Sequence, residues 1–228
     1  MMIVTLTEGE EAMTNKPYES NYDKVRENWR QKFLAMAKEA LTKRFGLEWD
    51  DDALYLEYFS NRMRIDSKTG EITYADRPDR KLTFNTAISI YNLFYYAADA
   101  PAASGRMVLF REVKRAYPFE QAYRQTILKK VEECFAGRVD LLKAACEKLC
   151  GTALPQGDAG YVIPVFPFLN MAILFWDEDE EFPAKANMLF DSNVTDFMHE
   201  ENVVGIASDL VYYLTEAAGL GAEEIYGG

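Results

Sequence analysis

Five consecutive acidic residues, Asp177 to Glu181, are the group in this sequence whose types and spacing are best suited to chemistry. They lie between two apolar, strand-like stretches, so we expect them at the tip of a hairpin. A run of like charges repels itself and therefore stays in water, contacts basic side chains or holds a cation. In an extended backbone Asp177, Asp179 and Glu181 point to the same side, where their oxygens are suitable ligands for Mg²⁺ or Ca²⁺.

Two other interpretations of the acidic run remain open beside the metal site. In the first, the acids are only the solvated tip of two paired core strands. In the second, they contact basic side chains from elsewhere and hold two parts of the domain together. The basic candidates are Arg62, Arg64, Arg106, Arg111, Lys114 and Arg115. An EF-hand is excluded, because Phe182 stands where that calcium loop needs glycine.

The residues expected to bind a ligand or partner lie mostly on this hairpin. They are Trp176, Asp177, Asp179, Glu180, Glu181, Phe182 and Asp191, together with Arg106 and Arg111. A separate aromatic group either lines a cleft for a flat ligand or belongs to the core. It consists of Tyr91, Phe94, Tyr95 and Tyr96.

Other common catalytic chemistries lack their residues. His199 is the only histidine, no Gly-x-Ser-x-Gly turn accompanies it, and we expect it at the start of the last helix. Neither a phosphate-binding loop nor a dinucleotide-binding glycine motif is present, so no nucleotide cofactor is expected. The three cysteines, Cys134, Cys146 and Cys150, lack the further ligands of a zinc or redox cluster, which predicts reduced thiols in the core.

The composition favours a folded protein in a reducing compartment. Of the 228 residues 49% are hydrophobic, enough for a sizeable core. The net charge of -12 works against binding a phosphate backbone, so nucleic acid is not an expected partner. No apolar stretch approaches the roughly 20 residues that span a bilayer, and the first residues carry acids where a signal peptide is basic. We therefore expect a cytoplasmic protein without a membrane partner.

Periodicity predicts helices and strands in blocks rather than in strict alternation. Apolar residues three or four apart indicate helices over 22–46, 85–98, 119–135, 139–149 and 203–214. Strands are expected over 53–59, 62–66, 71–74, 161–167, 171–176 and 186–190. Pro164 and Pro167 confine the fourth of these strands to an edge or a bulge. The expected fold class is α+β, with a mainly antiparallel sheet built from two hairpin-bearing segments and helices packed on it.

We expect one globular domain over residues 17–221, between two tails. Residues 1–16 are acidic and lack a sustained period, and residues 222–228 follow the last helix. Met13, directly before Thr14 to Pro17, is an alternative start to Met1.

Several separated motifs together resemble one protein family. They are Gly157 to Tyr161, Phe166-Pro167, Phe175 to Asp177, Asp179 to Ala184 and Leu189 to Asp191, with Ser104-Gly105 and Phe110 to Glu112 before them. In this combination the sequence resembles, from about Tyr22 to Leu220, the family called domain of unknown function 3786 of anaerobic bacteria and archaea. The resemblance implies no activity, since the family has none assigned. Some members carry a cysteine-rich iron–sulfur segment, but this chain has no cysteine before Cys134, so no cluster is expected here.

Two functional hypotheses from different classes follow from these residues. The first is a non-catalytic binding or accessory module, in which the acidic hairpin and an aromatic cleft engage a partner protein or a small molecule. We favour this hypothesis because the residues present do not complete a known catalytic set. The alternative is an enzyme in which Asp177, Asp179 and Glu181, with Asp191 as a further candidate, hold a divalent cation, Mg²⁺ or Ca²⁺, that activates water or a substrate oxygen.

Overall fold

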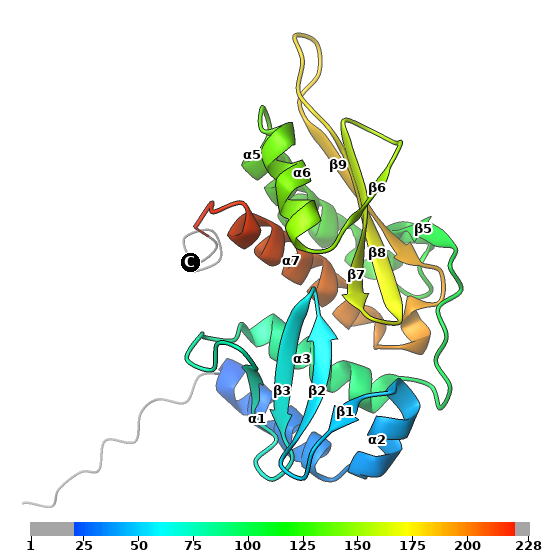
Figure 1. Ribbon diagram of the computed structural model, residues 1–228. Helices are drawn as coiled ribbons and strands as arrows, with labels where there is room; N and C mark the ends of the chain where they lie inside the picture. Colours follow the sequence, from blue (N-terminus) through cyan, green and yellow to red (C-terminus); the bar gives the residue numbers. More distant parts are fainter. Residues whose placement is uncertain (1–20, 222–228) are drawn as a thin grey trace, which may run out of the picture.

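The computed structural model describes residues 21–221 and contains two antiparallel sheets with helices packed around them. The sheet drawn at the bottom of Figure 1 comes from the first part of the chain, and the upper one from the second. The predicted α+β class is confirmed. Each hairpin-bearing segment builds a sheet of its own. The predicted tails, 1–16 and 222–228, and the alternative start Met13 lie outside the described residues.

The lower sheet follows two helices. Its elements are α1 (Asn21–Leu34), α2 (Lys38–Phe45), β1 (Glu48–Trp49), β2 (Ala53–Tyr58), β3 (Asn61–Asp66) and β4 (Ile72–Tyr74), with the strands in sequential order. The prediction of a single helix over 22–46 is wrong, because the helix is interrupted between Leu34 and Lys38. There the ammonium of Lys38 donates to the carbonyl oxygens of Phe33 and Met36, which satisfies acceptors at the end of α1. Gly46, with φ +64°, ends α2 as predicted.

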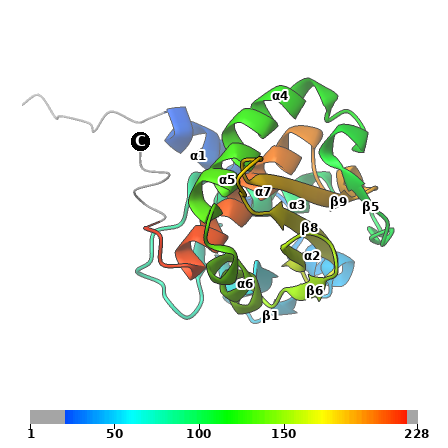
Figure 2. The same cartoon turned by 90° about the horizontal axis from the view of Figure 1, so that it is seen from above.

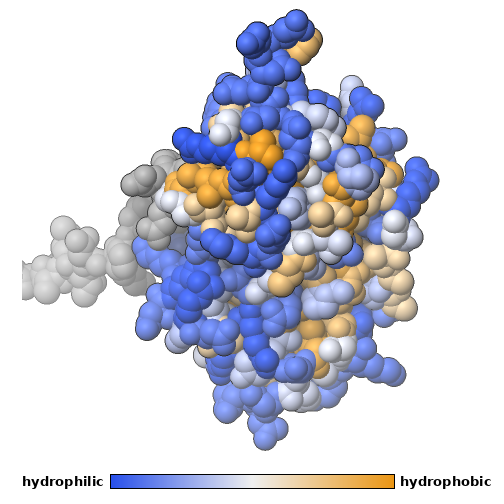
Figure 3. Space-filling model, turned by 45° about the horizontal axis from the view of Figure 1, so that its top comes forward, coloured by the Kyte–Doolittle hydropathy of each residue, from blue (hydrophilic) through white to orange (hydrophobic). Residues whose placement is uncertain are grey.

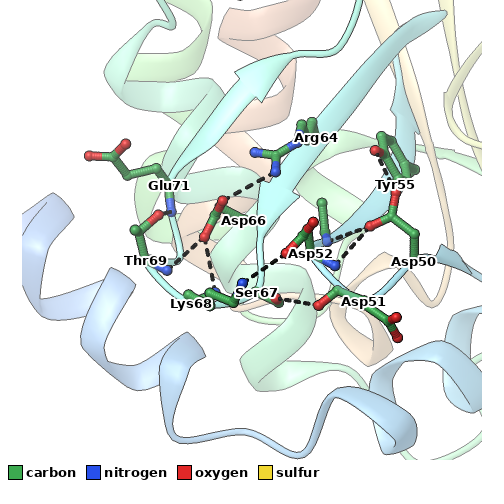
Figure 4. A network of polar contacts seen from close by, with 11 residues as sticks. Asp50, Asp51, Asp52, Tyr55, Arg64, Asp66, Ser67, Lys68, Thr69 and Glu71 are labelled. Carbon is green, nitrogen blue, oxygen red and sulfur yellow. Dashed lines mark hydrogen bonds and ion pairs between the residues drawn. The ribbon is translucent and has the colours of Figure 1, made fainter.

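The turn between β3 and β4 shows why its sequence forms a hairpin (Figure 4). Asp66 Oδ1 accepts hydrogen bonds from the backbone N–H groups of Lys68 at 3.0 Å and Thr69 at 2.8 Å. The Thr69 N–H is the largest influence on the Asp66 carboxyl and lowers its pKa to about 2. Tyr91 from the next helix donates to the Gly70 carbonyl at 2.6 Å. The turn is therefore held both by its own aspartate and by the core behind it.

The middle of the chain is mostly helical. Its elements are α3 (Phe84–Tyr96), β5 (Met107–Leu109), η1 (Phe110–Glu112), η2 (Tyr117–Phe119), α4 (Glu120–Ala122), η3 (Tyr123–Leu128), α5 (Lys129–Phe135) and α6 (Val139–Lys148). The helix predicted over 119–135 exists, but its central part, η3, is a π-helix. Figure 2 shows α4 and α5 beside the last helix, α7 (Glu200–Ala217). π-helices are rare in proteins, and those that occur often lie at functional sites. The surfaces around η3 are therefore candidates for a binding site.

The upper sheet has strand order β5-β9-β8-β7-β6. Its remaining elements are β6 (Thr152–Leu154), β7 (Ala159–Phe166), β8 (Leu169–Trp176) and β9 (Lys185–Asp191), and a 3-10 turn, η4 (Val194–Asp196), precedes α7. The prolines do not place β7 at an edge, since it pairs with β6 and β8. The predicted bulge is present between Pro164 and Phe166. The short strands β5 and β6 had no sequence signal.

A continuous hydrophobic core joins the two sheets. The turn between β2 and β3 reaches the upper sheet, where the backbone N–H of Phe59 donates to the Val165 carbonyl at 3.0 Å. Phe59 and Ser60 have φ of 45° and 59°, the backbone of a tight hairpin turn that non-glycine residues seldom adopt. The rings of Phe166 and Phe168 stack with centroids 5.6 Å apart beside it. Within residues 21–221 no helix is long and apolar enough to cross a membrane.

Candidate functional site

The acidic run forms the projecting tip between β8 and β9, as predicted. Trp176 and Lys185 face each other in the last register pair before the tip. The carboxylate of Asp179 folds the tip: its Oδ1 accepts hydrogen bonds from the backbone N–H groups of Glu181 and Phe182, both at 2.8 Å. The projecting tip is mostly hydrophilic in the space-filling view (Figure 3). Glu180 and Glu181 are exposed on it.

Asp177 and Asp158 anchor the base of the tip to the rest of the sheet. Asp177 Oδ1 accepts from the N–H groups of Gly137 at 2.8 Å and Glu178 at 2.9 Å. Asp158 Oδ2 accepts from the Asp177 N–H at 2.8 Å. Each of Asp158, Asp177 and Asp179 thus uses one carboxylate oxygen to shape the loop. Within the described residues, the other oxygen of each accepts no hydrogen bond and makes no ion pair.

The glycines of the Gly157 to Tyr161 motif explain how this base forms. Gly157 has φ +74°, and a Cβ at this position would lie 2.5 Å from the Phe175 carbonyl oxygen of β8. A Cβ on Gly160 would lie 2.3 Å from the Gln156 carbonyl oxygen. Only glycine allows these close backbone approaches. They bring Asp158 to the end of β8, where it binds Asp177.

The hairpin and the helix beside it enclose a cleft of 670 Å³, which we call the acidic-hairpin cleft. Its lining residues are Arg124, Leu128, Glu132, Asp158, Trp176, Asp177, Asp179, Phe182, Pro183, Lys185, Ala186 and Asn187. Trp176 and Phe182 are 39% and 65% exposed, so their rings remain available to a ligand. Four acids face two bases here, and one of the bases, Arg124, is paired with Glu120 at 2.5 Å. The cleft therefore combines aromatic surface with an excess of negative charge.

The predicted metal ligands are not gathered at one point. Among residues 21–221 no three histidine, cysteine, aspartate or glutamate side chains are placed so that they could hold a metal ion together. Asp177 and Asp179 turn one oxygen each toward backbone N–H groups instead. Among the described residues no ion pair includes an acid of the hairpin. Arg62 instead binds Glu48, and Arg64 binds Asp66. Among the three interpretations of the run, this geometry favours a tip that keeps most of its charge accessible.

The structure separates Asp191, Arg106 and Arg111 from the acidic tip. Asp191 ends β9 at the opposite end from Lys185, and it pairs there with Met107 of β5. Arg106 and Arg111 flank β5 and are exposed, and neither lines the acidic-hairpin cleft. The predicted group of ligand-binding residues thus divides into a cleft at one end of the sheet and a structural anchor at the other.

Asp191 is the structural anchor. It is 2% exposed and accepts hydrogen bonds from the hydroxyl of Ser104 at 2.6 Å and from the N–H groups of Ser104, Gly105 and Asn193. Burial raises the pKa of the Asp191 carboxyl, but these hydrogen bonds outweigh burial and leave that pKa below its ordinary value. The carboxylate therefore holds the loop before β5 in place.

We predict that Asp191→Ala lowers the free energy of unfolding by about 3 kcal/mol, since it removes the buried carboxylate that accepts the hydrogen bonds of Ser104, Gly105 and Asn193. Ser104→Ala, which removes a single side chain from the same group, should cost about 1 kcal/mol. Urea denaturation of both variants measures the difference. Equal losses would contradict the anchoring role of the carboxylate.

The remaining predicted residues have mainly structural roles. His199 caps α7 as expected, with its Nδ1 accepting from the Glu201 N–H at 3.3 Å. All three thiols are free; Cys146 is buried in the core, whereas Cys150 is exposed beyond the end of α6, so the core prediction is wrong for Cys150. In the aromatic group, Tyr91 and Phe94 are core residues, but Tyr95 and Tyr96 are 48% and 42% exposed.

Sequence reasoning missed a buried polar cluster between the two sheets. Asp209 of α7, 1% exposed, accepts hydrogen bonds from Tyr58 at 2.6 Å, Ser89 at 3.1 Å and Thr86 at 3.4 Å. Tyr213 continues the network from Thr86 at 3.1 Å. Desolvation raises the pKa of the Asp209 carboxyl to about 7, although its hydrogen-bond donors lower it. The available signal was a single acid on the apolar face of the last helix.

Comparison with known proteins identifies the family but no activity. The family model described as Domain of unknown function (DUF3786) matches residues 38–213, more than half of the chain, and the chain belongs to that family. No curated protein and no solved structure matches this sequence. The resemblance noted from the motifs is thus confirmed.

Proposed function

We propose that this protein is a non-catalytic binding module whose acidic-hairpin cleft takes up a basic side chain of a partner protein. The observation that carries the proposal is the 670 Å³ cleft in which exposed Trp176 and Phe182 stand beside the carboxylates of Asp158, Asp177 and Asp179. A guanidinium or ammonium group is attracted both to carboxylate oxygens and to the face of an aromatic ring. Arginine combines the two modes best, because its planar head binds carboxylates and stacks on rings.

The loop geometry supports this role because it presents charge without needing a ligand to fold. One oxygen of each cleft aspartate already accepts backbone hydrogen bonds, so the tip is organised in advance. Preorganisation lowers the entropic cost of binding. The other oxygens stay available, and the acids at the tip add a field that speeds the encounter with a basic partner.

The test is calorimetric titration of the full chain with a short peptide of alternating glycine and arginine, using variants matched in charge. Asp177→Asn/Asp179→Asn removes two charges from the cleft but keeps the Oδ1 acceptors that fold the loop. Glu180→Gln/Glu181→Gln removes two charges outside the cleft lining. We expect about a tenfold loss of affinity in the first pair and about twofold in the second. Equal losses would mean diffuse electrostatic attraction without a cleft, and would refute the proposal.

The same variants test the alternative of a divalent-metal enzyme on this hairpin. That alternative requires the carboxylates to move together, because the described residues do not gather three ligands. A rise in melting temperature with Mg²⁺ or Ca²⁺ that is lost in Asp177→Asn/Asp179→Asn would favour the metal site. The binding-module proposal expects no such rise, while Trp176→Ala should weaken the peptide through loss of its ring.

A further inference from the structure

A second and larger cleft, of 1010 Å³, lies among the helices, away from the acidic hairpin. Its walls come from α1, α3, the helical segment that contains η3, and the beginning of α7. We call it the helical cleft; its lining includes Trp29, Asn92, Tyr96, Phe119, Asn202 and Gly205. Its volume is at the upper end of the range for small-molecule sites. The proposed function makes no use of it.

Two almost completely buried carboxamides line this cleft with unused hydrogen-bonding capacity. Asn92 is 5% exposed, and its Oδ1 accepts from the backbone N–H of His199 at 3.0 Å. Its Nδ2 donates to no described residue. Asn202 is 8% exposed; its Nδ2 makes a 3.6 Å contact with the Met198 sulfur, and its Oδ1 accepts from no described residue. The cleft thus contains a free donor and a free acceptor near the first turn of α7.

Gly205 shows that space is reserved for one of these groups. Glycine inside a helix costs about 1 kcal/mol relative to alanine. A Cβ on Gly205 would lie 3.2 Å from Asn202 Oδ1, so the glycine leaves room for the carboxamide. The π-helix η3 contributes Thr126 and Ile127 to the opposite wall. Both features are locally unfavourable or rare, which is typical of functional sites.

The chemistry of the lining defines the kind of ligand. Neither Asn92 Nδ2 nor Asn202 Oδ1 is among the described side-chain atoms that are fully buried without a partner, so both atoms are open to the cleft and can pair with complementary groups of a ligand. The two charged side chains of the lining, Lys130 and Glu201, have opposite signs, so the cleft favours a ligand without net charge. The aromatic side chains of Trp29, Tyr96 and Phe119 favour a flat molecule. Asn92 accepts from the His199 N–H at the start of α7, and Asn202 lies in the first turn of that helix, so a ligand there can offer a C=O to Asn92 Nδ2 and an N–H to Asn202 Oδ1.

We infer that the helical cleft binds an uncharged, flat heterocycle with a lactam edge, that is, an N–H beside a C=O. Cyclic imides and lactams of the pyrimidinedione type have this edge. The inference does not rest on the acidic-hairpin cleft, so either proposal can fail without the other.

The probes are riboflavin, whose ring system carries such an edge and is fluorescent, and its 3-methyl derivative, which lacks the N–H. We expect riboflavin to bind the full chain with quenching of its fluorescence by the aromatic wall. The 3-methyl derivative should bind about tenfold more weakly, because Asn202 Oδ1 then stays unpaired. Uridine and 3-methyluridine repeat the comparison with a smaller ring.

The variant Asn202→Leu removes the acceptor at similar volume. It should lower the affinity for riboflavin about tenfold and abolish the difference between riboflavin and its 3-methyl derivative. If this variant does not fold, the comparison of the two ligands on the unmodified protein decides alone. Absence of binding by both riboflavin and uridine, or equal affinity for each methylated and unmethylated pair, would overturn the inference.

Discussion

Asp209→Asn is expected to remove about 3 kcal/mol of pH dependence from the stability of this protein between about pH 5 and pH 8. The native carboxyl has a pKa of about 7, against 3.8 for an exposed aspartate, because it is desolvated between α3, α7 and β2. Between these two values the native state keeps a proton that the unfolded chain has released. Stability therefore falls as pH rises through this range, and the penalty is complete above about pH 7.

Other acids with perturbed pKa values act in a different pH range. The pKa of Glu27 is lowered to about 2 by its hydrogen bonds with Arg30, and that of Asp66 is also about 2. Groups with lowered pKa values contribute stability that is lost only as pH falls below about 4. Tyr58 and Tyr213, which belong to the cluster, have pKa values raised by burial and stay neutral. Between pH 5 and pH 8, Asp209 is thus the member of this cluster whose protonation state changes.

Urea denaturation at pH 5 and at pH 8, for the unmodified protein and for Asp209→Asn, gives the free energies of unfolding. The variant does not titrate; its amide oxygen can accept from Tyr58 and Ser89 in place of Asp209 Oδ2, and its amide N–H can donate to the Thr86 hydroxyl in place of Oδ1. Tyr58→Phe provides a control: it removes one donor but leaves the carboxyl, so the pH dependence should persist. An unchanged pH dependence in Asp209→Asn would show that this carboxyl is not the responsible group.

Gly157→Ala is expected to cost about 3 kcal/mol and to damage the acidic-hairpin cleft at the same time. The position combines φ +74° with a Cβ that would lie 2.5 Å from the Phe175 carbonyl oxygen. Relief of this contact moves Asp158 away from the end of β8, where its N–H donates to Phe175 at 2.8 Å and its carboxylate binds Asp177. The affinity for the glycine–arginine peptide should therefore fall as well.

Gly46→Ala is the matched control for backbone conformation. Gly46 has φ +64°, but a Cβ there meets no atom within 4 Å, so only the left-handed backbone is penalised, by about 1 kcal/mol. Peptide affinity should be unchanged in this variant. If both variants lost the same stability, the close approach of Gly157 to β8 would have no energetic role.

The sequence predicted the elements whose signals are local. The hairpin turn at Asp66, the cap at His199 and the end of α2 at Gly46 all depend on residues within a few positions, and each is present. The break after Leu34 was missed because a lysine side chain, rather than a proline or glycine, terminates the first helix. The two-residue strand β1 and the three-residue strands β5 and β6 are formed by their neighbours in space, and their sequences carry no period of their own.

The candidate site was predictable only in part, for a similar reason. The acidic run and its two flanking aromatics are visible in the sequence, and the structure brings both aromatics, with Asp177 and Asp179 of the run, to one cleft. Asp158 and Arg124 join them through pairing of β7 with β8 and through packing of η3, which no local pattern encodes. Asp191 carries the same side chain as the tip acids, but its neighbours in space are the backbone donors of a loop some 87 residues away.

The most direct test of the proposed function is an NMR titration of the full chain, labelled with ¹⁵N, with the glycine–arginine peptide. We predict saturable amide shifts confined to the residues that form or hold the acidic-hairpin cleft, namely 176–187, Asp158, Gly137, Arg124, Leu128 and Glu132. These shifts should disappear in Asp177→Asn/Asp179→Asn and persist in Glu180→Gln/Glu181→Gln. Shifts scattered over the acidic surface, or no saturable shift at any peptide concentration, would contradict it.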